Sequence, residues 1–168
     1  MKKYFLFIVV LFSLISCEED VSFNNPSLQG MKDNVFWRGV QSRATLAPNG
    51  SLLIESFTAN ETLSLKTTST TAQTYFLGTS ESKKATYTIT DATNGLVTFS
   101  TGFGIGEGQI VITEYDAVNK TVTGTFKFNA ENTDDSLSAS QIVNFQQGVF
   151  YKIPVSPTVL TAKVNFAH

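Results

Sequence analysis

The sequence predicts an all-β fold: a single antiparallel β-sandwich or barrel-like domain of about nine or ten strands, after a signal peptide and a short tether. From residue 34 onward, short runs rich in Thr, Val, Ile, Phe and Tyr alternate with clusters of Gly, Asn, Asp and Ser, which is typical of strands separated by turns. Apolar residues at helical spacing nowhere persist over about twelve residues, so any helix is at most a single turn, near residues 135–140. Many short strands with frequent turns favour a sandwich or a barrel equally.

The chain begins with the pattern of a secretory signal peptide over residues 1–16. A Lys-Lys pair supplies the positive charge, and the apolar run over residues 4–14 covers only about half of a hydrocarbon core that needs ~20 helical residues. The segment Leu14-Ile15-Ser16-Cys17 then fits a lipobox, in which the cysteine thiol receives a diacylglycerol. We therefore expect cleavage before Cys17 and lipidation of its thiol.

Residues 17–33 are predicted to be the lipidated cysteine and a flexible tether, because they are polar, contain Asn24-Asn25-Pro26 and lack a sustained apolar pattern. The acidic run Glu18-Glu19-Asp20 directly after the cysteine resembles the surface-export signals of Bacteroidota lipoproteins. The prediction is an exported lipoprotein held at the outer membrane by its N-terminal lipid, either on the cell surface or on the periplasmic face. Residues 34–168 then form the β-domain.

The strands of this domain are predicted from the alternation of apolar and polar residues. In chain order, they are expected at residues 35–40, 52–57, 63–65, 85–89, 97–99, 109–115, 121–130, 142–145 and 149–155. The clearest is the strand at 121–130, in which Val122, Phe126 and Phe128 share one face and threonines share the other. Asp and Asn in residues 116–120 favour a tight turn, so the strands on either side are expected to form a hairpin.

Charge and residue types exclude several classes of function. Without its first sixteen residues the chain has ten basic and fourteen acidic residues, a net charge of −4, and no basic stripe, which argues against nucleic-acid binding. Cys17 is the only cysteine, and His168, the last residue, is the only histidine. Ser-His-Asp, Cys-His and zinc sites are therefore excluded, no disulfide forms within the chain, and no cofactor is expected.

Carboxylates are the catalytic chemistry that the composition leaves open, because a glycosidase needs only two suitably spaced acids. The available acids are Glu55, Glu107, Glu114, Asp116, Glu131, Asp134 and Asp135. One polar loop contains Glu131, Asp134, Asp135 and Ser136. Its oxygens match the ligands that calcium prefers, and Asp135-Ser136-Leu137 fits an O-glycosylation pattern of Bacteroidota, but a solvated loop is the ordinary explanation.

Aromatic side chains are the candidate ligand contacts. Trp37, Phe103 and Tyr115 are of the type that stacks on sugar rings, and also of the type that fills an all-β core. Trp37 has apolar neighbours, so we favour burial for it. Residues 102–108 have glycine at every second position, but Glu107 replaces the third glycine of a dinucleotide fingerprint and a strand follows. This segment is interpreted as a loop or strand whose glycine face lets either backbone or a large ring, such as that of Trp37, approach closely.

Several segments carry a likeness that extends over nearly all of the chain after Cys17. They are the lipobox, the acidic tether, Val35-Phe36-Trp37, Leu63-Ser64-Leu65, Thr74-Tyr75-Phe76-Leu77-Gly78, residues 108–116 and residues 120–128. In these segments the chain resembles the small uncharacterised lipoproteins of Bacteroidota that carry a β-rich domain of unknown function. The resemblance implies an exported, β-rich lipoprotein, and because its motifs are structural it offers no catalytic residues.

These observations predict a non-catalytic, lipid-anchored protein of the envelope or cell surface, which acts as a binding or structural accessory for a glycan or a partner protein. A carboxylate-dependent hydrolase acting on extracellular polymers is one alternative, and a subunit of a larger envelope complex is the other. A hydrolase requires two acids that converge in a concave pocket, at least one of them with a perturbed pKa, and a binding module requires a flat or grooved aromatic face. A complex subunit requires an apolar patch or an unpaired edge strand.

Overall fold

The computed structural model describes residues 27–92, 95–133 and 141–158, and this part of the chain is all-β. Its eleven strands are β1 (Ser27–Lys32), β2 (Val35–Arg38), β3 (Gln41–Leu46), β4 (Leu52–Phe57), β5 (Glu61–Thr67), β6 (Gln73–Leu77), β7 (Lys84–Asp91), β8 (Gly95–Ser100), β9 (Glu107–Asp116), β10 (Thr121–Asn132) and β11 (Ile142–Pro157). None of the described residues forms a helix that is long and apolar enough to cross a membrane. The predicted signal peptide, Cys17 and the single turn near residues 135–140 lie outside the described residues.

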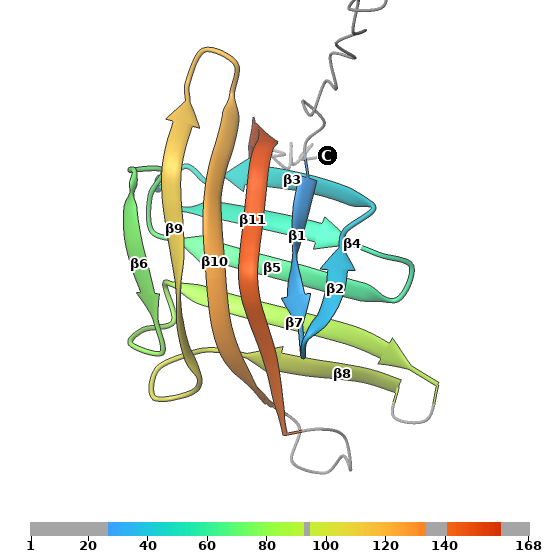
Figure 1. Ribbon diagram of the computed structural model, residues 1–168. Coiled ribbons are helices and arrows are strands. Elements are labelled where there is room, and N and C mark those ends of the chain that lie inside the picture. Colours follow the sequence, from blue (N-terminus) through green and yellow to red (C-terminus); the bar gives the residue numbers. More distant parts are fainter. Residues whose placement is uncertain (1–26, 93–94, 134–140, 159–168) are drawn as a thin grey trace, which may run out of the picture.

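The strands form two layers that cross each other (Figure 1). Strands β2, β1, β11, β10, β9 and β6 make the front layer, and β3, β4, β5, β7 and β8 make the back layer. Two short ladders join the layers at opposite corners: β11 pairs with β3 over three residues, and β10 pairs with β8 over two. Because of these corner ladders, the pairing closes into a ring through β11, β3, β4, β5, β7, β8 and β10.

The predicted all-β class is confirmed, but the predicted antiparallel sheet is wrong at one position. The ladder between β11 and β3 is parallel, with Val155 opposite Ala44 and Pro157 opposite Leu46. This pairing arises because β11 is long enough to continue past the edge of the front layer and run beside β3 in the back layer. The sheet is therefore mixed, and it has one or two strands more than the sequence predicts.

One of the additional strands, β1, lies within the predicted tether. The side chain of Leu28 is fully buried, and Gly30 comes so close to β11 that a Cβ on it would lie 3.1 Å from the Cα of Gly148. The backbone of β1 pairs with β11 on one side and with β2 on the other. A strand held mainly by backbone pairing shows little apolar alternation, which is why the sequence pattern does not reveal it. Any tether therefore ends before Ser27.

The hydrophobic core fills the space between the two layers. Phe128 and Phe145 stack in it with ring centroids 5.0 Å apart, and Phe126 packs beside them. Glycine makes room for one of these rings, because a Cβ on Gly148 would lie 2.5 Å from the ring of Phe126. Burying each ring contributes about 1.5–3 kcal/mol. The inner faces of β10 and β11 are thus committed to packing, and their outer faces are open to solvent.

Candidate functional site

The candidate site lies on the outer face of the front layer, over β9, β10 and β11. The side chains of β10 alternate strictly, so that Phe126 and Phe128 point into the core while Thr125, Lys127 and Asn129 point outward. Each outward position of β10 has neighbours on both sides, because β10 is paired with β9 and with β11 along most of its length. A side chain on this face is therefore positioned by a continuous three-stranded sheet.

A β-bulge in β11 adds an extra residue to this face. Phe126 pairs with Gly148 and Phe128 pairs with Phe145, so Gln146 and Gln147 both lie opposite the single residue between the two phenylalanines. Both glutamine side chains are exposed, whereas two successive residues of a regular strand would point to opposite faces. The bulge thus presents two neighbouring amides to solvent.

The backbone at this bulge is strained. Gln147 has a φ of 52°, in the left-handed region that L-residues other than Asn and Asp seldom adopt. Holding a residue there costs about 1 kcal/mol or more, and such residues gather at functional sites. The register confirms that the distortion belongs to β11 itself, because β1 shows the same irregularity where Gln29 pairs with Val149 and Met31 pairs with Gln146.

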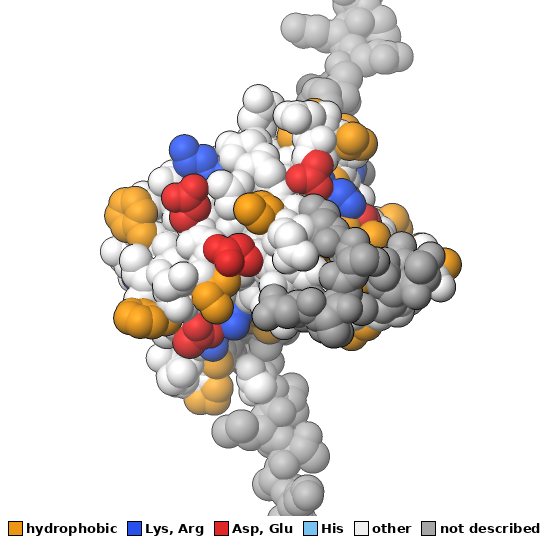
Figure 2. Space-filling model, turned by 90° about the horizontal axis from the view of Figure 1, so that it is seen from below, with side chains coloured by type: hydrophobic (Ala, Val, Ile, Leu, Met, Phe, Trp, Pro, Cys, Tyr) orange, Lys and Arg blue, Asp and Glu red, His pale blue; other side chains and the backbone are white. Residues whose placement is uncertain are grey.

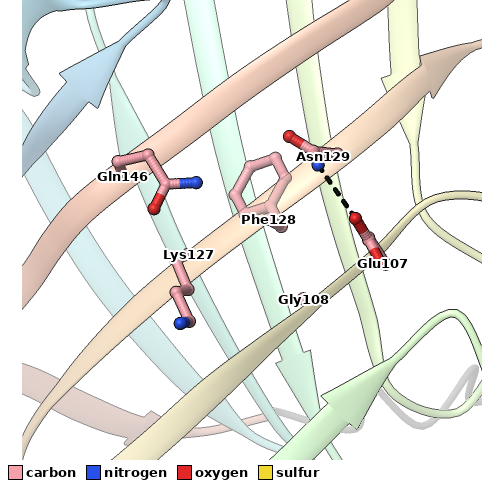
Figure 3. Close-up of a pocket in the computed structure, with 6 residues that line it drawn as sticks. All are labelled: Glu107, Gly108, Lys127, Phe128, Asn129 and Gln146. Atoms are coloured by element: carbon pink, nitrogen blue, oxygen red, sulfur yellow. Dashed lines mark hydrogen bonds between the residues drawn. The ribbon is translucent and has the colours of Figure 1, made fainter.

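Two shallow hollows adjoin each other over β10, and we refer to them together as the groove. The first, of about 270 Å³, is lined by Glu107, Gly108, Lys127, Phe128, Asn129 and Gln146 (Figure 3). The second, of about 410 Å³, is lined by Gln109, Thr125, Phe126, Lys127, Gln147, Gly148 and Val149. Lys127 borders both. Enclosed small-molecule pockets measure roughly 300–1,000 Å³, so an open groove of this kind suits a ligand that extends beyond either hollow.

Hydrogen bonds fix the amides at one end of the groove. Asn144 donates from Nδ2 to Asn129 Oδ1 over 2.5 Å, and Asn129 donates from Nδ2 to Glu107 Oε1 over 3.1 Å. The backbone N–H of Asn144 is itself bound by Asp33 Oδ1 at 2.9 Å. Figure 3 shows the bonded pair Asn129 and Glu107 on one side of Phe128, with Lys127 on the other. This end of the groove is therefore rigid, and it presents carboxylate and amide oxygens in fixed positions.

The middle of the groove offers polar groups that are not used within the fold. Within residues 27–92, 95–133 and 141–158, the side chains of Lys127, Gln146 and Gln147 make no hydrogen bond or ion pair. Lys127 and both glutamines are exposed, and Val149 adds an apolar surface beside them. Free donors and acceptors next to a fixed polar network are what a hydroxyl-rich ligand requires.

The three predicted ligand contacts are not brought together. Trp37 is buried, as we favoured, with its ring edge-on to Phe145 at 5.7 Å. Phe103 lies in the loop before β9 and is 76% exposed, while Tyr115 lies at the other end of β9 and is half-buried. A strand of this length separates its ends by roughly 25–30 Å at about 3.3 Å per residue. These three residues therefore do not form one aromatic platform, and Phe103 and Tyr115 stay separate candidate contacts.

The predicted glycine face is approached by the backbone of β10, which is one of the two expected alternatives, and not by a ring. A Cβ on Gly108 would lie 2.6 Å from the Cα of Phe128 and 2.7 Å from its Cβ, because β9 pairs with β10 at this point. Trp37 does not approach this segment, since it belongs to β2 at the far edge of the front layer.

Several of the candidate acids that the structure describes accept hydrogen bonds within the fold, and Glu107 and Glu131 lie near each other at the start of β9. Glu131 accepts the N–H of Gly106 at 2.9 Å, and Glu55 pairs with Arg43 at 2.9 Å. Asp116 accepts the N–H groups of the turn between β9 and β10, and these bonds, chiefly that from Asn119, lower its pKa. From below, acidic and basic side chains are interspersed rather than gathered (Figure 2).

No acid pair of the hydrolase type lines the groove. Glu107 is the single carboxylate among the residues lining the two hollows. No three Asp, Glu, His or Cys side chains of the described ranges lie close enough together to hold a metal ion. In the predicted calcium or glycosylation loop, Asp134, Asp135 and Ser136 lie outside the described residues, and only Glu131 is placed.

A partly buried polar cluster that the sequence does not reveal connects the two layers. Glu61, at the start of β5, accepts hydrogen bonds from Lys32 Nζ at 2.6 Å and from Trp37 Nε1 at 2.5 Å, and also from the hydroxyl of Tyr87. Lys32 Nζ additionally lies 2.7 Å from the Tyr87 hydroxyl. No sequence motif signals this cluster, because its members come from β1, β2, β5 and β7.

The charge state of this cluster suits a structural role. Burial acts to raise the pKa of Glu61, but the hydrogen bonds from Lys32, Tyr87 and Trp37 outweigh it and hold this pKa below its usual value. Burial and the hydrogen bond to Glu61 raise the pKa of Tyr87. A carboxylate that stays ionised and whose two oxygens both accept hydrogen bonds is a poor proton donor, so we interpret Glu61 as a clamp between the layers.

Comparison with known proteins identifies one family. A family model described as a domain of unknown function, DUF6252, matches residues 24–154, from just before β1 to near the end of β11. No curated protein and no solved structure matches the chain. The start of the match supports the assignment of β1 to the folded domain.

Proposed function

The chain belongs to the DUF6252 family, and we propose that it is a non-catalytic binding protein of the cell envelope that holds a glycan in the groove over β10. The lipobox supports attachment to the outer membrane through a lipid on Cys17. The acidic run after this cysteine supports display on the cell surface. Under this proposal, the lipid keeps the domain at the membrane and the groove captures the ligand.

The observation that carries the proposal is the strained bulge of β11. Gln147 keeps a left-handed backbone conformation in which glycine would be unstrained, and in return its side chain joins that of Gln146 on the open face. Because Gln147 is strained and its side chain does not pack in the core, the best explanation is that this side chain binds a ligand. The bulge therefore points to binding on this face.

The chemistry of the groove favours a sugar over other ligands. Lys127 and the glutamines donate hydrogen bonds, Glu107 and the amide oxygens accept them, and Val149 offers an apolar contact. One cation and one anion give the groove no strong charge, which suits neutral hydroxyl groups. The groove is also shallow, so it admits part of a long polymer without enclosing it.

The edge strands give less support to a subunit of an envelope complex. β2 and β6 end the front layer, and Phe36 and Phe76 on them are 61% and 60% exposed. These rings lie at opposite edges of the layer and so do not form one apolar patch. A protein partner remains an outcome that the following experiment separates from a glycan.

The proposal predicts that Lys127→Ala weakens retention by a polysaccharide. Residues 18–168, which contain every described strand, are run through native gels containing β-glucan, xylan, mannan, starch or pectin. We expect one of these polymers to retard the protein and Lys127→Ala to reduce the affinity about tenfold, since a central polar contact contributes about 1.4 kcal/mol.

The matched control is Lys66→Ala, which removes an exposed lysine from β5 in the back layer. Its affinity is expected to equal that of the unmodified protein. Equal effects of the two substitutions would place the binding elsewhere. Retardation by none of the polymers would contradict glycan binding and leave a protein partner as the function to pursue.

A further inference from the structure

A second bulge follows the first along β11. Gly124 pairs with Phe150 and Val122 pairs with Ile153, so Tyr151 and the residue after it both lie opposite a single residue of β10. That following residue, Lys152, has a φ of 48°. Tyr151 is half-buried and Lys152 is exposed, while the residues flanking this pair are buried. The second bulge therefore repeats the construction of the first, with a left-handed second residue and two side chains on one face.

The pair presented by the second bulge is aromatic and basic rather than amide. Lys152 Nζ lies 5.4 Å from the centroid of the Tyr151 ring, and the N–H of Lys152 donates to Thr123 Oγ1 at 3.1 Å. The left-handed residues of the two bulges are five positions apart, which corresponds to roughly 16 Å along a strand. Val149 lies between them on the same outer face.

We propose that the second bulge is a second subsite beyond the Val149 end of the groove, and that the ligand is a linear, hydroxyl-rich polysaccharide chain lying along β11. Hydroxyl groups of one sugar bind at Gln146 and Gln147, and the apolar face of another stacks on the ring of Tyr151 by displacing Lys152 Nζ from above it. This inference rests on the proposed function. It adds the class of ligand and the direction in which it lies.

The pairing of β11 disfavours an extended peptide as the occupant. A peptide added to a sheet needs a strand with free backbone N–H and C=O groups. Between Phe145 and Tyr151, β11 is paired with β10 on one side and with β1 on the other, so its backbone is already used. Only side chains remain available, and two subsites roughly 16 Å apart are beyond the reach of a single sugar.

The test compares short and long oligosaccharides prepared from the polymer that the gels identify. Isothermal titration of residues 18–168 is expected to show affinity that rises with chain length and then levels off once both subsites are filled. Tyr151→Ala should lower the affinity for long chains about tenfold and leave that for short chains unchanged. Lys127→Ala should lower both.

Two further variants keep the result interpretable. Tyr151→Phe retains the ring and should bind as the unmodified protein does. Tyr151→Leu retains apolar volume without a flat ring, so it is expected to fold and to bind long chains about tenfold more weakly than the unmodified protein does. This variant gives the same test if Tyr151→Ala unfolds. Affinity independent of chain length, or full affinity in Tyr151→Leu, would overturn the second subsite while glycan binding stands. Binding of no saccharide would overturn the proposed function as well.

Discussion

Gln147 combines an unfavourable backbone with an exposed side chain, and this combination makes a prediction about stability. In Gln147→Gly, relief of left-handed strain of about 1 kcal/mol offsets the extra entropy that glycine gives the unfolded chain, which costs about 0.5–1 kcal/mol. We expect a free energy of unfolding within about 0.5 kcal/mol of the unmodified value, measured by urea denaturation. Glycan affinity should fall in the same variant.

The neighbouring residue supplies the control. Gln146 is equally exposed but is not among the residues with positive φ, so Gln146→Gly gains no relief and should lose about 1 kcal/mol. If both substitutions destabilise the protein equally, the conformation at Gln147 is not strained.

At the scale of single residues, the sequence predicts burial and hydrogen bonding where the neighbours that decide them are close in the chain. The apolar neighbours of Trp37 correctly indicate its burial, and the turn residues of 116–120 correctly indicate that Asp116 bonds the backbone of the turn. Glu61 is different, because its partners Lys32 and Tyr87 lie 29 and 26 residues away in the chain. Of the four side chains that donate to Glu61, only Thr58 is close to it in the sequence, so the sequence does not show that the other three converge on it.

Strands are predictable from sequence where one face packs in the core and the other is exposed to solvent. β10 and β9 contain the predicted segments and extend them by one or two residues at an end, because their alternation is regular. β11 is predicted only as two separate runs, 142–145 and 149–155. Gln146, Gln147 and Gly148 lie between these runs and interrupt the alternation. The sequence pattern therefore indicates a break between two strands where the structure has a β-bulge within one strand. The candidate groove is missed for the same reason.

Substitution of Gly148, the glycine of this bulged segment, tests how tightly β10 and β11 pack. Gly148→Ala places a methyl group 2.5 Å from the ring of Phe126, so the ring or the strand must shift. We expect a loss of about 1–3 kcal/mol in the free energy of unfolding, measured by thermal denaturation. Val149→Ala on the same strand faces solvent and should change it by about 0.5 kcal/mol. Similar small effects of both would show that the ring has room to move.

At the scale of the molecule, the two layers are joined by few backbone bonds. The corner ladders comprise only two and three residue pairs, so the layers are held together mainly by the core between them and by the cluster around Glu61. Lys32 and Trp37 belong to the front layer, and Glu61 and Tyr87 to the back. This cluster should therefore contribute to the stability of the whole domain.

Glu61→Gln tests this contribution and gives it a pH dependence. The variant keeps the shape but removes the charge, so we expect a loss of about 2 kcal/mol or more at neutral pH. The pKa of Glu61 is lowered by folding, so its contribution is complete above its unfolded pKa and is lost as the pH falls through the lower folded value. The difference between the two proteins should therefore shrink in acid, as followed by urea denaturation across pH.

The exposed ion pair provides the comparison. Glu55→Gln breaks a contact with Arg43, whose side chain is 62% exposed, and should cost about 1 kcal/mol or less. A loss as small in Glu61→Gln, or one that does not change with pH, would show that the cluster is not a clamp.

The position of β11 in the sheet also has a consequence for the order of events during synthesis. This strand is the last of those described to leave the ribosome, yet it lies between β1 and β10 and also pairs with β3. The ring cannot close, and β1 has only β2 beside it, until the final strand has been made. Such distant contacts slow folding. If the protein is exported as proposed, a ring that closes only with its last strand would keep the chain unfolded for longer, which is the condition that a translocation channel imposes on proteins that it passes unfolded.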